Sequence, residues 1–241
     1  MTAPAGGWSI ERRVGTARAL HEPWPAPTER RRRTVALCSL RGPRAVVLGS
    51  SQSMDVVNLE RAASEGVDVV RRRSGGGAVL VGAGEQVWVD VWIPRDDALW
   101  DDDVIRSSWW LGETWKRALE ELGAPGLLVH RGRSTGRDWS DLVCFAGIGP
   151  GEVMAGTAKV VGVAQRRTGE GARLHSMAPL SWQPAPLLTL LALDPERARL
   201  AHDELGDVAI GVRGILPPSL CDTERHRVAS AVEDALVAAL P

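Results

Sequence analysis

Lysine and tyrosine are scarce in this 241-residue chain, which has no tyrosine, one phenylalanine and ten tryptophans. Of its 29 basic residues only Lys116 and Lys159 are lysines, and the others are arginines. Arginine presents a broad, permanently charged fork, whereas lysine is a compact point charge. A lysine that survives such a bias is a candidate for chemistry that a guanidinium cannot perform, and chance is the alternative explanation for either lysine alone.

Other absences argue against several classes of protein. Cys38, Cys144 and Cys221 are odd in number and lack CxxC spacing, which argues against a disulfide framework or a zinc finger and favours a reducing cytoplasm. No apolar run approaches the roughly 18 residues of a membrane helix, and residues 1–7 lack the apolar core of a signal peptide. The net charge of −1 and the unclustered histidines argue against nucleic acid and metal. We expect a cytoplasmic protein that binds neither membrane nor nucleic acid.

The chain divides into a short arm and one domain. Residues 1–33 end in the run Arg30–Arg33 and are expected to form a flexible N-terminal arm. Its arginines form a solvated loop or, alternatively, contact nucleic acid or acidic lipid. Residues 34–241 show no internal repeat, and their strands occur both in hairpins and between helices. This pattern predicts a single α+β domain with a mixed β-sheet and flanking helices.

Hydrophobic periodicity predicts individual elements. Apolar residues at 87, 89, 91 and 93 alternate with Trp88, Asp90 and Trp92, which predicts a strand. Residues 103–122 and 223–240 are predicted helices, the second with Asp222 as its N-cap. Residues 142–148 are a predicted strand, and residues 152–166 are a predicted hairpin that turns near residues 156 and 157.

A glycine-rich loop is expected where residues 71–79 read RRRSGGGAV. Glycines let a ligand approach the backbone closely, and backbone N–H groups can converge there on an anion. The neighbouring arginines suit phosphate or carboxylate groups. The segment lacks the Gly-Lys-Ser/Thr of a Walker loop and is not GxGxxG. It predicts an anion site, with a plain tight turn as the alternative.

Three further residues are candidates for chemistry. Lys159, in the segment GTAKVVGVAQRR, shares the face of a predicted strand with Val161 and Val163. Its ammonium is expected to be partly buried and to meet an anion, or to reach solvent at the strand end. Cys144 is either a small buried residue or a nucleophilic thiol activated by the positive charge of Lys159 or His175. An ordinary packed histidine is the default for His175.

Together, RRRSGGGAV and the following GTAKVVGVAQRR resemble the catalytic domain of the lipoate–protein ligase family, whose fold is shared with biotin ligases and lipoyl(octanoyl) transferases. The resemblance runs from about residue 35 to about residue 179 and includes a GSSQ turn. It implies a biotin/lipoate protein ligase-like catalytic domain over residues 34–241. The aromatic residue, His-Asp and Gly-Asn that usually follow SGGGAV are replaced by LVGAGE at residues 80–85, which changes the nucleotide and metal contacts.

The resemblance also implies roles for particular residues. Lys159 matches the lysine that bridges the acyl carboxyl group and the phosphate, where a fixed ammonium offsets the repulsion between two anions. The residues matched to acyl-adenylate binding are Arg72, Ser74, Gly75, Gly76, Gly77, Ala78, Val79, Leu80 and His175. Cys144 precedes Lys159 by fifteen residues, a spacing similar to that of the cysteine in one branch of the octanoyl transferases. It is catalytic only in that alternative.

The sequence therefore favours a lipoate–protein ligase that attaches lipoate or octanoate to a lysine of a lipoyl carrier domain through an acyl-adenylate. ATP and Mg²⁺ would be consumed as substrate, and the carrier domain would belong to a 2-oxoacid dehydrogenase or a glycine-cleavage protein. One alternative is an ATP-independent octanoyl transferase with Cys144 as nucleophile. Another is a non-catalytic sensor of lipoate or its adenylate, which the changes at Val81, Gly82 and Glu85 motivate.

Overall fold

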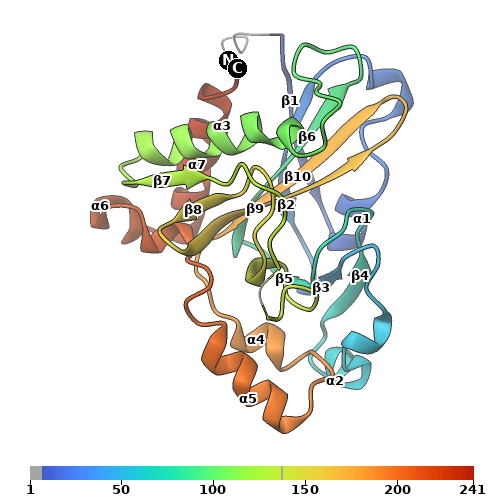
Figure 1. Ribbon diagram of the computed structural model, residues 1–241, viewed down its shortest axis with the longest axis vertical. Coiled ribbons are helices and arrows are strands. Elements are labelled where there is room, and N and C mark those ends of the chain that lie inside the picture. The colour runs from blue at the N-terminus through green and yellow to red at the C-terminus, as the bar shows by residue number, and fades with distance from the viewer. Residues whose placement is uncertain (1–6, 137) are drawn as a thin grey trace.

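Two β-sheets with helices packed around them make up the fold in the computed structural model, which describes residues 7–136 and 138–241 (Figure 1). The strands of the larger sheet, in spatial order, are β1 Ser9–Gly15, β2 Thr34–Leu40, β6 Gln86–Pro94, β10 Gly171–Pro179, β9 Ala158–Arg167, β8 Val153–Ala155 and β7 Leu127–Val129. The smaller sheet has the order β4 Asp68–Arg71, β3 Ala45–Leu48 and β5 Val79–Val81.

Both sheets are mixed, as the sequence predicted. Strand β1 runs parallel to β2 and β3 runs parallel to β4, whereas the other strand pairs are antiparallel. The register of β10 places His175 opposite Asp90 on β6 and opposite Ala164 on β9. Side chains at directly opposed positions lie close enough to interact, so this register prepares the site described below.

The helices cover the sheets with apolar stripes. Their bounds are α1 Ala17–His21, α2 Leu59–Ser64, α3 Trp109–Glu121, α4 Ala185–Leu188, α5 Pro195–Glu204, α6 Pro218–Cys221 and α7 Arg225–Ala238, and the 3₁₀ helices are η1 Pro27–Glu29, η2 Met54–Val56, η3 Arg106–Ser108, η4 Cys144–Ala146 and η5 Val212–Gly214. Helices α3 and α7 pack in the core of the larger sheet, and α4 and α5 pack by the smaller one (Figure 1).

Strand β6 separates two parts of the core. Its nine residues are all buried, and successive side chains point to opposite faces of the sheet. Val87, Val89, Val91 and Ile93 pack in the cluster that holds α3 and α7, whereas Trp88 and Trp92 pack in the cluster that holds α1. The predicted strand is confirmed, and its alternation carries Asp90 into the second cluster.

A flexible arm was expected over residues 1–33, but the described part of this segment packs against the domain. Residues 9–15 form β1, which pairs along its whole length with β2. Trp8, Leu20 and Trp24 are buried, and the indole of Trp8 donates a hydrogen bond of 2.8 Å to the carbonyl of Pro241. These apolar side chains are scattered without a period, so the pattern did not reveal them. Residues 1–6 lie outside the described residues.

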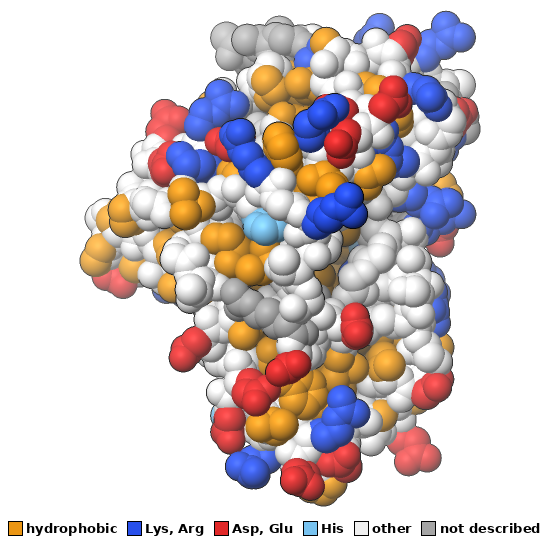
Figure 2. Space-filling view, viewed as in Figure 1, with side chains coloured by type: hydrophobic (Ala, Val, Ile, Leu, Met, Phe, Trp, Pro, Cys, Tyr) orange, Lys and Arg blue, Asp and Glu red, His pale blue; other side chains and the backbone are white. Residues whose placement is uncertain are grey.

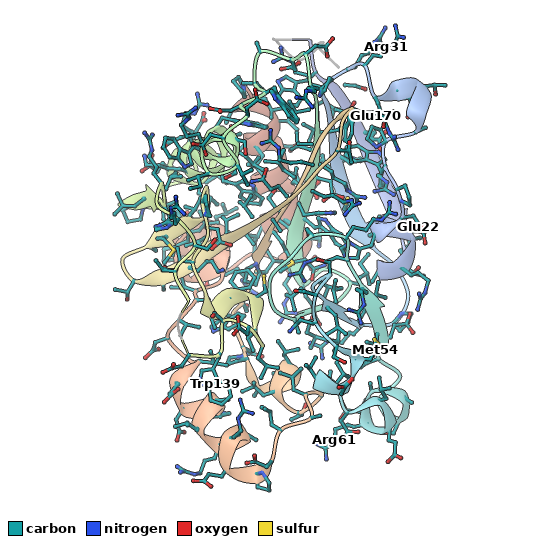
Figure 3. The ribbon with its side chains drawn as sticks, turned by 45° about the vertical axis from the view of Figure 1, so that its right-hand side comes forward. Glu22, Arg31, Met54, Arg61, Trp139 and Glu170 are labelled. Carbon is teal, nitrogen blue, oxygen red and sulfur yellow. The ribbon has the colours of Figure 1, made fainter. Side chains whose placement is uncertain are left out.

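The arginine run at the end of this segment is partly paired. Arg33 lies 3.0 Å from a carboxylate oxygen of Asp97, and Arg30 forms an ion pair with Glu170 at the turn between β9 and β10. Figure 3 shows Glu170 on the same side of the molecule as Arg31 of this segment. Arg31 and Arg32 are exposed, as a solvated loop predicts.

Other boundaries differ from the sequence expectations. Residues 142–148 contain the short helix η4 instead of a strand, because this segment crosses Ala78 through a single bridge at Val143 and turns away. The predicted helix at residues 103–122 consists of the 3₁₀ helix η3 followed directly by the α-helix α3. Helix α7 has Glu224 at its N-cap, not Asp222. The hairpin of β8 and β9 is confirmed, whereas β10 and α5 were not predicted.

The surface carries charges of both signs. Figure 2 shows basic and acidic side chains interspersed on the upper part of one face, with acidic side chains spread over its lower part. No helix in residues 7–136 and 138–241 is both long enough and apolar enough to cross a membrane.

Candidate functional site

Lys159 lies near the start of β9 and is 1% exposed. Its Nζ donates to the carbonyl oxygens of Cys144 at 2.8 Å and Gly147 at 2.5 Å, and it lies 2.9 Å from Oε2 of Glu152. The ammonium also faces the ring of Phe145 at 5.1 Å from its centroid. The expectation that this ammonium is buried and meets an anion is confirmed, and the anion is a carboxylate of the chain itself.

Glu152 was not singled out from the sequence. It is 4% exposed and precedes β8 directly. Its Oε2 accepts a hydrogen bond of 2.7 Å from the backbone N–H of Gly149, and its Oε1 accepts one of 3.1 Å from that of Val163. Both oxygens are therefore fixed, and a buried ion pair needs such additional hydrogen bonds to offset desolvation. A lone acid in a turn has no periodic signal, so only its short separation from Lys159 could have indicated it.

Arg72 holds the glycine-rich loop together. Its guanidinium is buried and donates to the carbonyl oxygens of Gly75 at 2.7 Å, Gly77 at 2.9 Å and Val47 at 3.2 Å. The role implied for Arg72 was to bind an acyl-adenylate, and these bonds instead occupy it with the backbone of the loop. Ser74 is also buried, and its hydroxyl has no hydrogen-bond partner among the described residues.

The loop can take this form because glycines occupy it. Gly76 has a φ of 97°, in the region that favours glycine. A Cβ on Gly77 would lie 2.6 Å from the carbonyl carbon of Val143, so the loop rests directly on the segment that leads into η4. Glycine is thus favoured at Gly76 by the backbone conformation and at Gly77 by close approach of another backbone segment.

Cys144 opens η4 and is half-buried. Its backbone N–H donates to the carbonyl of Ala78 at 2.9 Å, which fixes it beside the loop. Its Sγ lies 4.0 Å from Nη2 of Arg72. The sequence suggested Lys159 or His175 as the cation near the thiol, but the ammonium of Lys159 binds the carbonyl oxygen of this residue, and Arg72 is the cation that contacts its sulfur.

Two cavities meet at Cys144. One is an open cleft of about 750 Å³, lined by Gly75, Gly76, Gly77, Glu152, Lys159 and Cys144 among others. The other is a smaller, apolar pocket, lined by Val47, Val79, Val81, Trp88, Met177 and Cys144 together with Arg72, His21 and His175. Cys144 thus borders both a cleft that contains charged side chains and a pocket that is almost entirely apolar.

The residues implied for acyl-adenylate binding are not all brought together. Gly75, Gly76 and Gly77 line the cleft, and Arg72, Val79 and His175 line the apolar pocket. Ala78 and Leu80 line a third cavity, next to Trp182 and Phe145. Leu80 therefore lies away from both cavities that meet at Cys144.

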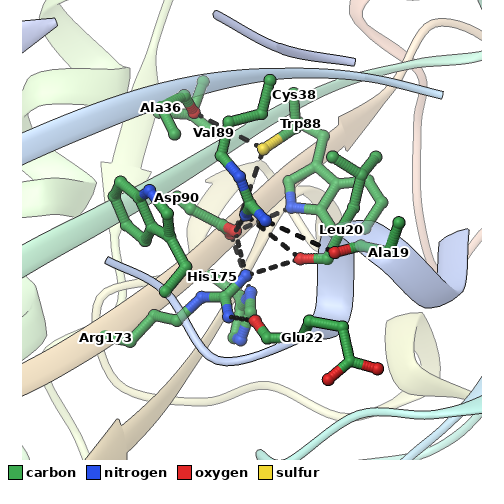
Figure 4. Close-up of polar contacts among 12 residues, drawn as sticks. Ala19, Leu20, Glu22, Ala36, Cys38, Trp88, Val89, Asp90, Arg173 and His175 are labelled. Atoms are coloured by element: carbon green, nitrogen blue, oxygen red, sulfur yellow. Dashed lines mark hydrogen bonds and ion pairs between the residues drawn. The ribbon is translucent and has the colours of Figure 1, made fainter. Parts of the chain in front are cut away.

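A buried charge network lies beside the apolar pocket (Figure 4). The Asp90 carboxylate accepts hydrogen bonds from Arg173 at 2.6 Å and from the Trp88 indole at 2.9 Å, and it lies 2.7 Å from Nδ1 of His175. Burial raises the pKa of Asp90, but the charges and hydrogen bonds of His175 and Arg173 outweigh it and hold that pKa well below its usual range. Asp90 is therefore an anion, and Nδ1 of His175 donates to it.

Both histidines of the pocket have lowered pKa values. Burial lowers the pKa of His175, although Asp90 opposes the effect. Burial, reinforced by the neighbouring His175, lowers the pKa of His21 to about 3. The His21 ring lies 4.8 Å from the Trp88 ring and 5.6 Å from that of His175, and its Nδ1 is buried without a partner in the described part of the chain. His21 was not predicted to be near the site, because it lies in the segment expected to be flexible.

Comparisons with known proteins agree with this geometry. A family model described as "Lipoyl protein ligase A/B catalytic domain" matches residues 20–217. The chain therefore belongs to the lipoyl protein ligase A/B catalytic domain family, which the sequence resemblance had indicated. The match begins within the segment that was expected to be a flexible arm.

One curated relative is named as an octanoyltransferase. The octanoyltransferase LipM of Moorella thermoacetica is 30% identical over 159 residues, which are 65% of this chain and 57% of that protein. The match thus spans little more than half the length of that curated relative.

Solved structures share the fold. A bi-partite lipoate protein ligase from Thermoplasma acidophilum, described with its E2 lipoyl domain, has a TM-score of 0.65 at 17% identity, over 96% of this chain and 84% of that chain. Protein Ta0514 of T. acidophilum, with bound lipoic acid, has a TM-score of 0.63 at 18% identity, over 98% and 85% of the two chains. At such identities the likeness concerns the fold alone.

Proposed function

We propose that this protein is an acyltransferase that moves an octanoyl or lipoyl group from a thioester donor to a lysine of a lipoyl carrier domain, with Cys144 as the nucleophile. The observation that carries the proposal is the position of Cys144 where the cleft that holds Lys159 and Glu152 meets the apolar pocket. The acyl chain would lie in the pocket, and the donor and then the carrier lysine would enter through the cleft.

The reaction has two balanced steps. The Cys144 thiolate attacks the donor's carbonyl carbon, the carbon–sulfur bond of the donor breaks, and the donor thiol leaves with the proton that Cys144 gave up. The neutral amine of the carrier lysine then attacks the carbonyl carbon of the acyl-cysteine, the carbon–sulfur bond to Cys144 breaks as the amide forms, and the proton released by the amine restores the Cys144 thiol. A positive charge 4.0 Å from the sulfur, on Arg72, favours the negative charge that forms there.

Lys159 acts in this proposal as a positioning residue. Its ammonium binds the carbonyl oxygen of Cys144 and that of Gly147, so it fixes the backbone that carries the thiol. Because three acceptors already surround the ammonium, a substrate carboxylate would have to displace one of them. This occupation, together with the 30% identity to an octanoyltransferase, favours the transferase over the adenylate-forming ligase.

An acyl-adenylate ligase is the second candidate, and one observation favours it. Gly75, Gly76 and Gly77 line the same cleft as Lys159, so a phosphate bound by the loop's N–H groups would lie in the cleft that the ammonium borders. ATP and Mg²⁺ would then be co-substrates with lipoate or octanoate. In either case the acceptor would be a lipoyl carrier domain, from a 2-oxoacid dehydrogenase or a glycine-cleavage protein, and the cytoplasm would be the compartment.

Intact mass spectrometry separates the candidates. The protein is incubated with an octanoyl thioester and no ATP, then with octanoate, ATP and Mg²⁺, each with and without a lipoyl carrier domain. The transferase gives an acylated enzyme without carrier, and an acylated carrier without ATP. Modification of the carrier only when ATP is present would contradict the proposal and support the ligase, and binding of lipoate without modification in either arm would support the sensor.

Cysteine variants provide the matched controls. Cys144→Ser should abolish both the acyl-enzyme and the thioester-dependent transfer. Cys221→Ser, also half-buried but remote from the cleft lining, should leave both unchanged. Full ATP-dependent ligation by Cys144→Ser would show that the thiol only fills space.

A further inference from the structure

A small cavity rich in arginine lies next to the charge network. It is lined by Trp24, Arg30, Arg73, Trp92, Arg166 and Arg173, together with His175, which also lines the apolar pocket. The N-terminal segment, strand β6, the β9–β10 hairpin and the start of the glycine-rich loop contribute these residues. No acidic residue of the described chain is in its lining.

Two of the four arginines are compensated. Arg30 forms an ion pair with Glu170, and Arg173 lies 2.6 Å from the Asp90 carboxylate. Arg73 and Arg166 form no ion pair with any described residue, and they meet each other through a hydrogen bond of 3.4 Å from Nη1 of Arg166 to the carbonyl of Arg73. Both of these arginines are exposed, so the cavity lining carries an excess of two positive charges at its solvent-facing side.

Aromatic rings hold the compensated arginines in place. The guanidinium carbon of Arg30 lies 5.6 Å from the ring centroid of Trp92, and that of Arg173 lies 5.6 Å from that of Trp24. Such cation–π contacts fix a guanidinium without consuming its donors. The Nε of Arg173 is buried and has no partner among the described residues. This donor is enclosed by protein atoms and is not itself open to the cavity.

We propose that this cavity binds a phosphate group in its dianionic form. Two uncompensated charges match a phosphate dianion, whereas a carboxylate neutralises only one, and arginines are the preferred partners of phosphate oxygens. The cavity volume of about 60 Å³ holds a few water-sized groups at roughly 10–15 Å³ each, which is enough for the four oxygens of a phosphate. The group would be inorganic phosphate or the phosphate of a coenzyme A-type compound.

Isothermal titration calorimetry tests the site without any acyl transfer, so its outcome is independent of the Cys144 chemistry. Inorganic phosphate and coenzyme A are titrated separately into the wild-type chain, with acetate at equal ionic strength as the monoanion. We expect one phosphate per chain and no acetate binding. Coenzyme A that binds at least tenfold more tightly than inorganic phosphate identifies the phosphorylated compound as the source, and equal affinities identify the free ion.

Paired variants decide whether these arginines form the site. Arg73→Gln with Arg166→Gln should raise the Kd for phosphate at least tenfold, whereas Arg197→Gln with Arg199→Gln on α5 removes the same net charge elsewhere and should not. Binding of coenzyme A should weaken severalfold from pH 7.5 to pH 5.0, because the second pKa of a phosphate monoester is about 6. No heat with phosphate, or equal Kd values in the two double variants, would overturn the proposal.

Discussion

Arg72 lies against Cys144, with its Nη2 4.0 Å from the sulfur and 2.9 Å from the carbonyl oxygen of Gly77. One guanidinium thus contacts the thiol and holds the glycine-rich loop at the same time. A substitution that moves the loop is therefore expected to move the guanidinium away from the thiol as well.

Lys159→Arg should lower acyl transfer more than tenfold, which corresponds to about 1.4 kcal/mol in the activation barrier. The space between the Cys144 carbonyl, the Gly147 carbonyl and Glu152 fits a compact ammonium, and a planar guanidinium is too wide for it. Steady-state rates with a carrier domain provide the measurement. Lys116→Arg, on α3, is the control and should keep the wild-type rate; a variant at position 159 that retains more than about a tenth of the rate would contradict the prediction.

Glu152→Gln should destabilise the protein by about 3 kcal/mol, because it leaves the buried ammonium of Lys159 without a countercharge. The matched control is Glu120→Gln, which removes the partner of Lys116 in an ion pair at the surface and should cost less than about 1 kcal/mol. Urea unfolding followed by circular dichroism measures both. Equal losses in the two variants would show that the buried pair is worth no more than the exposed one.

Gly77→Ala should lower both the melting temperature and the rate of transfer. Its Cβ would lie 2.6–2.7 Å from backbone atoms of Val143 and Cys144, so the loop or η4 must shift. Gly75→Ala is the control, since a Cβ there meets nothing within 4 Å and the φ needs no glycine. Differential scanning calorimetry gives the melting temperatures, and an unchanged value for Gly77→Ala would argue against the close contact.

The melting temperature should fall as the pH is lowered from 7 to 4.5, and His21→Phe should reduce this dependence. The pKa of folded His21 is lowered from its ordinary value of 6.5 to about 3, so in this window the unfolded chain binds a proton that the folded chain does not. Stability therefore rises with pH through the window and is lost as the pH falls. Phenylalanine keeps the contact with Trp88 but cannot titrate. The lowered pKa of His175 acts in the same direction, so part of the dependence should remain; a variant with the full wild-type dependence would exclude His21 as its source.

Sequence patterns predicted those parts of the site whose conformation depends on residues adjacent in the sequence. The alternation in β6 and the glycines of the loop are encoded by neighbouring residues, and both occur as predicted. Glu152 and His21 reach the site through contacts with segments distant in sequence or through a turn without a period, so no pattern identified them. The packing of the N-terminal segment was not predicted for the same reason, since Trp8 and Trp24 are buried only by other elements.

The run of apolar residues that contains Cys144 shows a different limit. Residues 142–148 have the composition of a strand, but the backbone pairs with Ala78 at one point and then turns to bring its carbonyl groups to Lys159. The strand preference of a segment is thus overridden by its tertiary context, which here includes the contacts of a single ammonium.

The scarcity of lysine has a consequence for side reactions. An active site that prepares an acyl group for transfer to an amine also exposes that group to the amines of its own chain. Here one lysine is enclosed in an ion pair at 1% exposure, and the other is paired with Glu120 on α3. The arginines that cover the rest of the surface are poor acyl acceptors because they stay protonated. If the proposed function holds, the two lysines of the chain offer little opportunity for self-acylation, and the amine of an incoming carrier meets little competition from them.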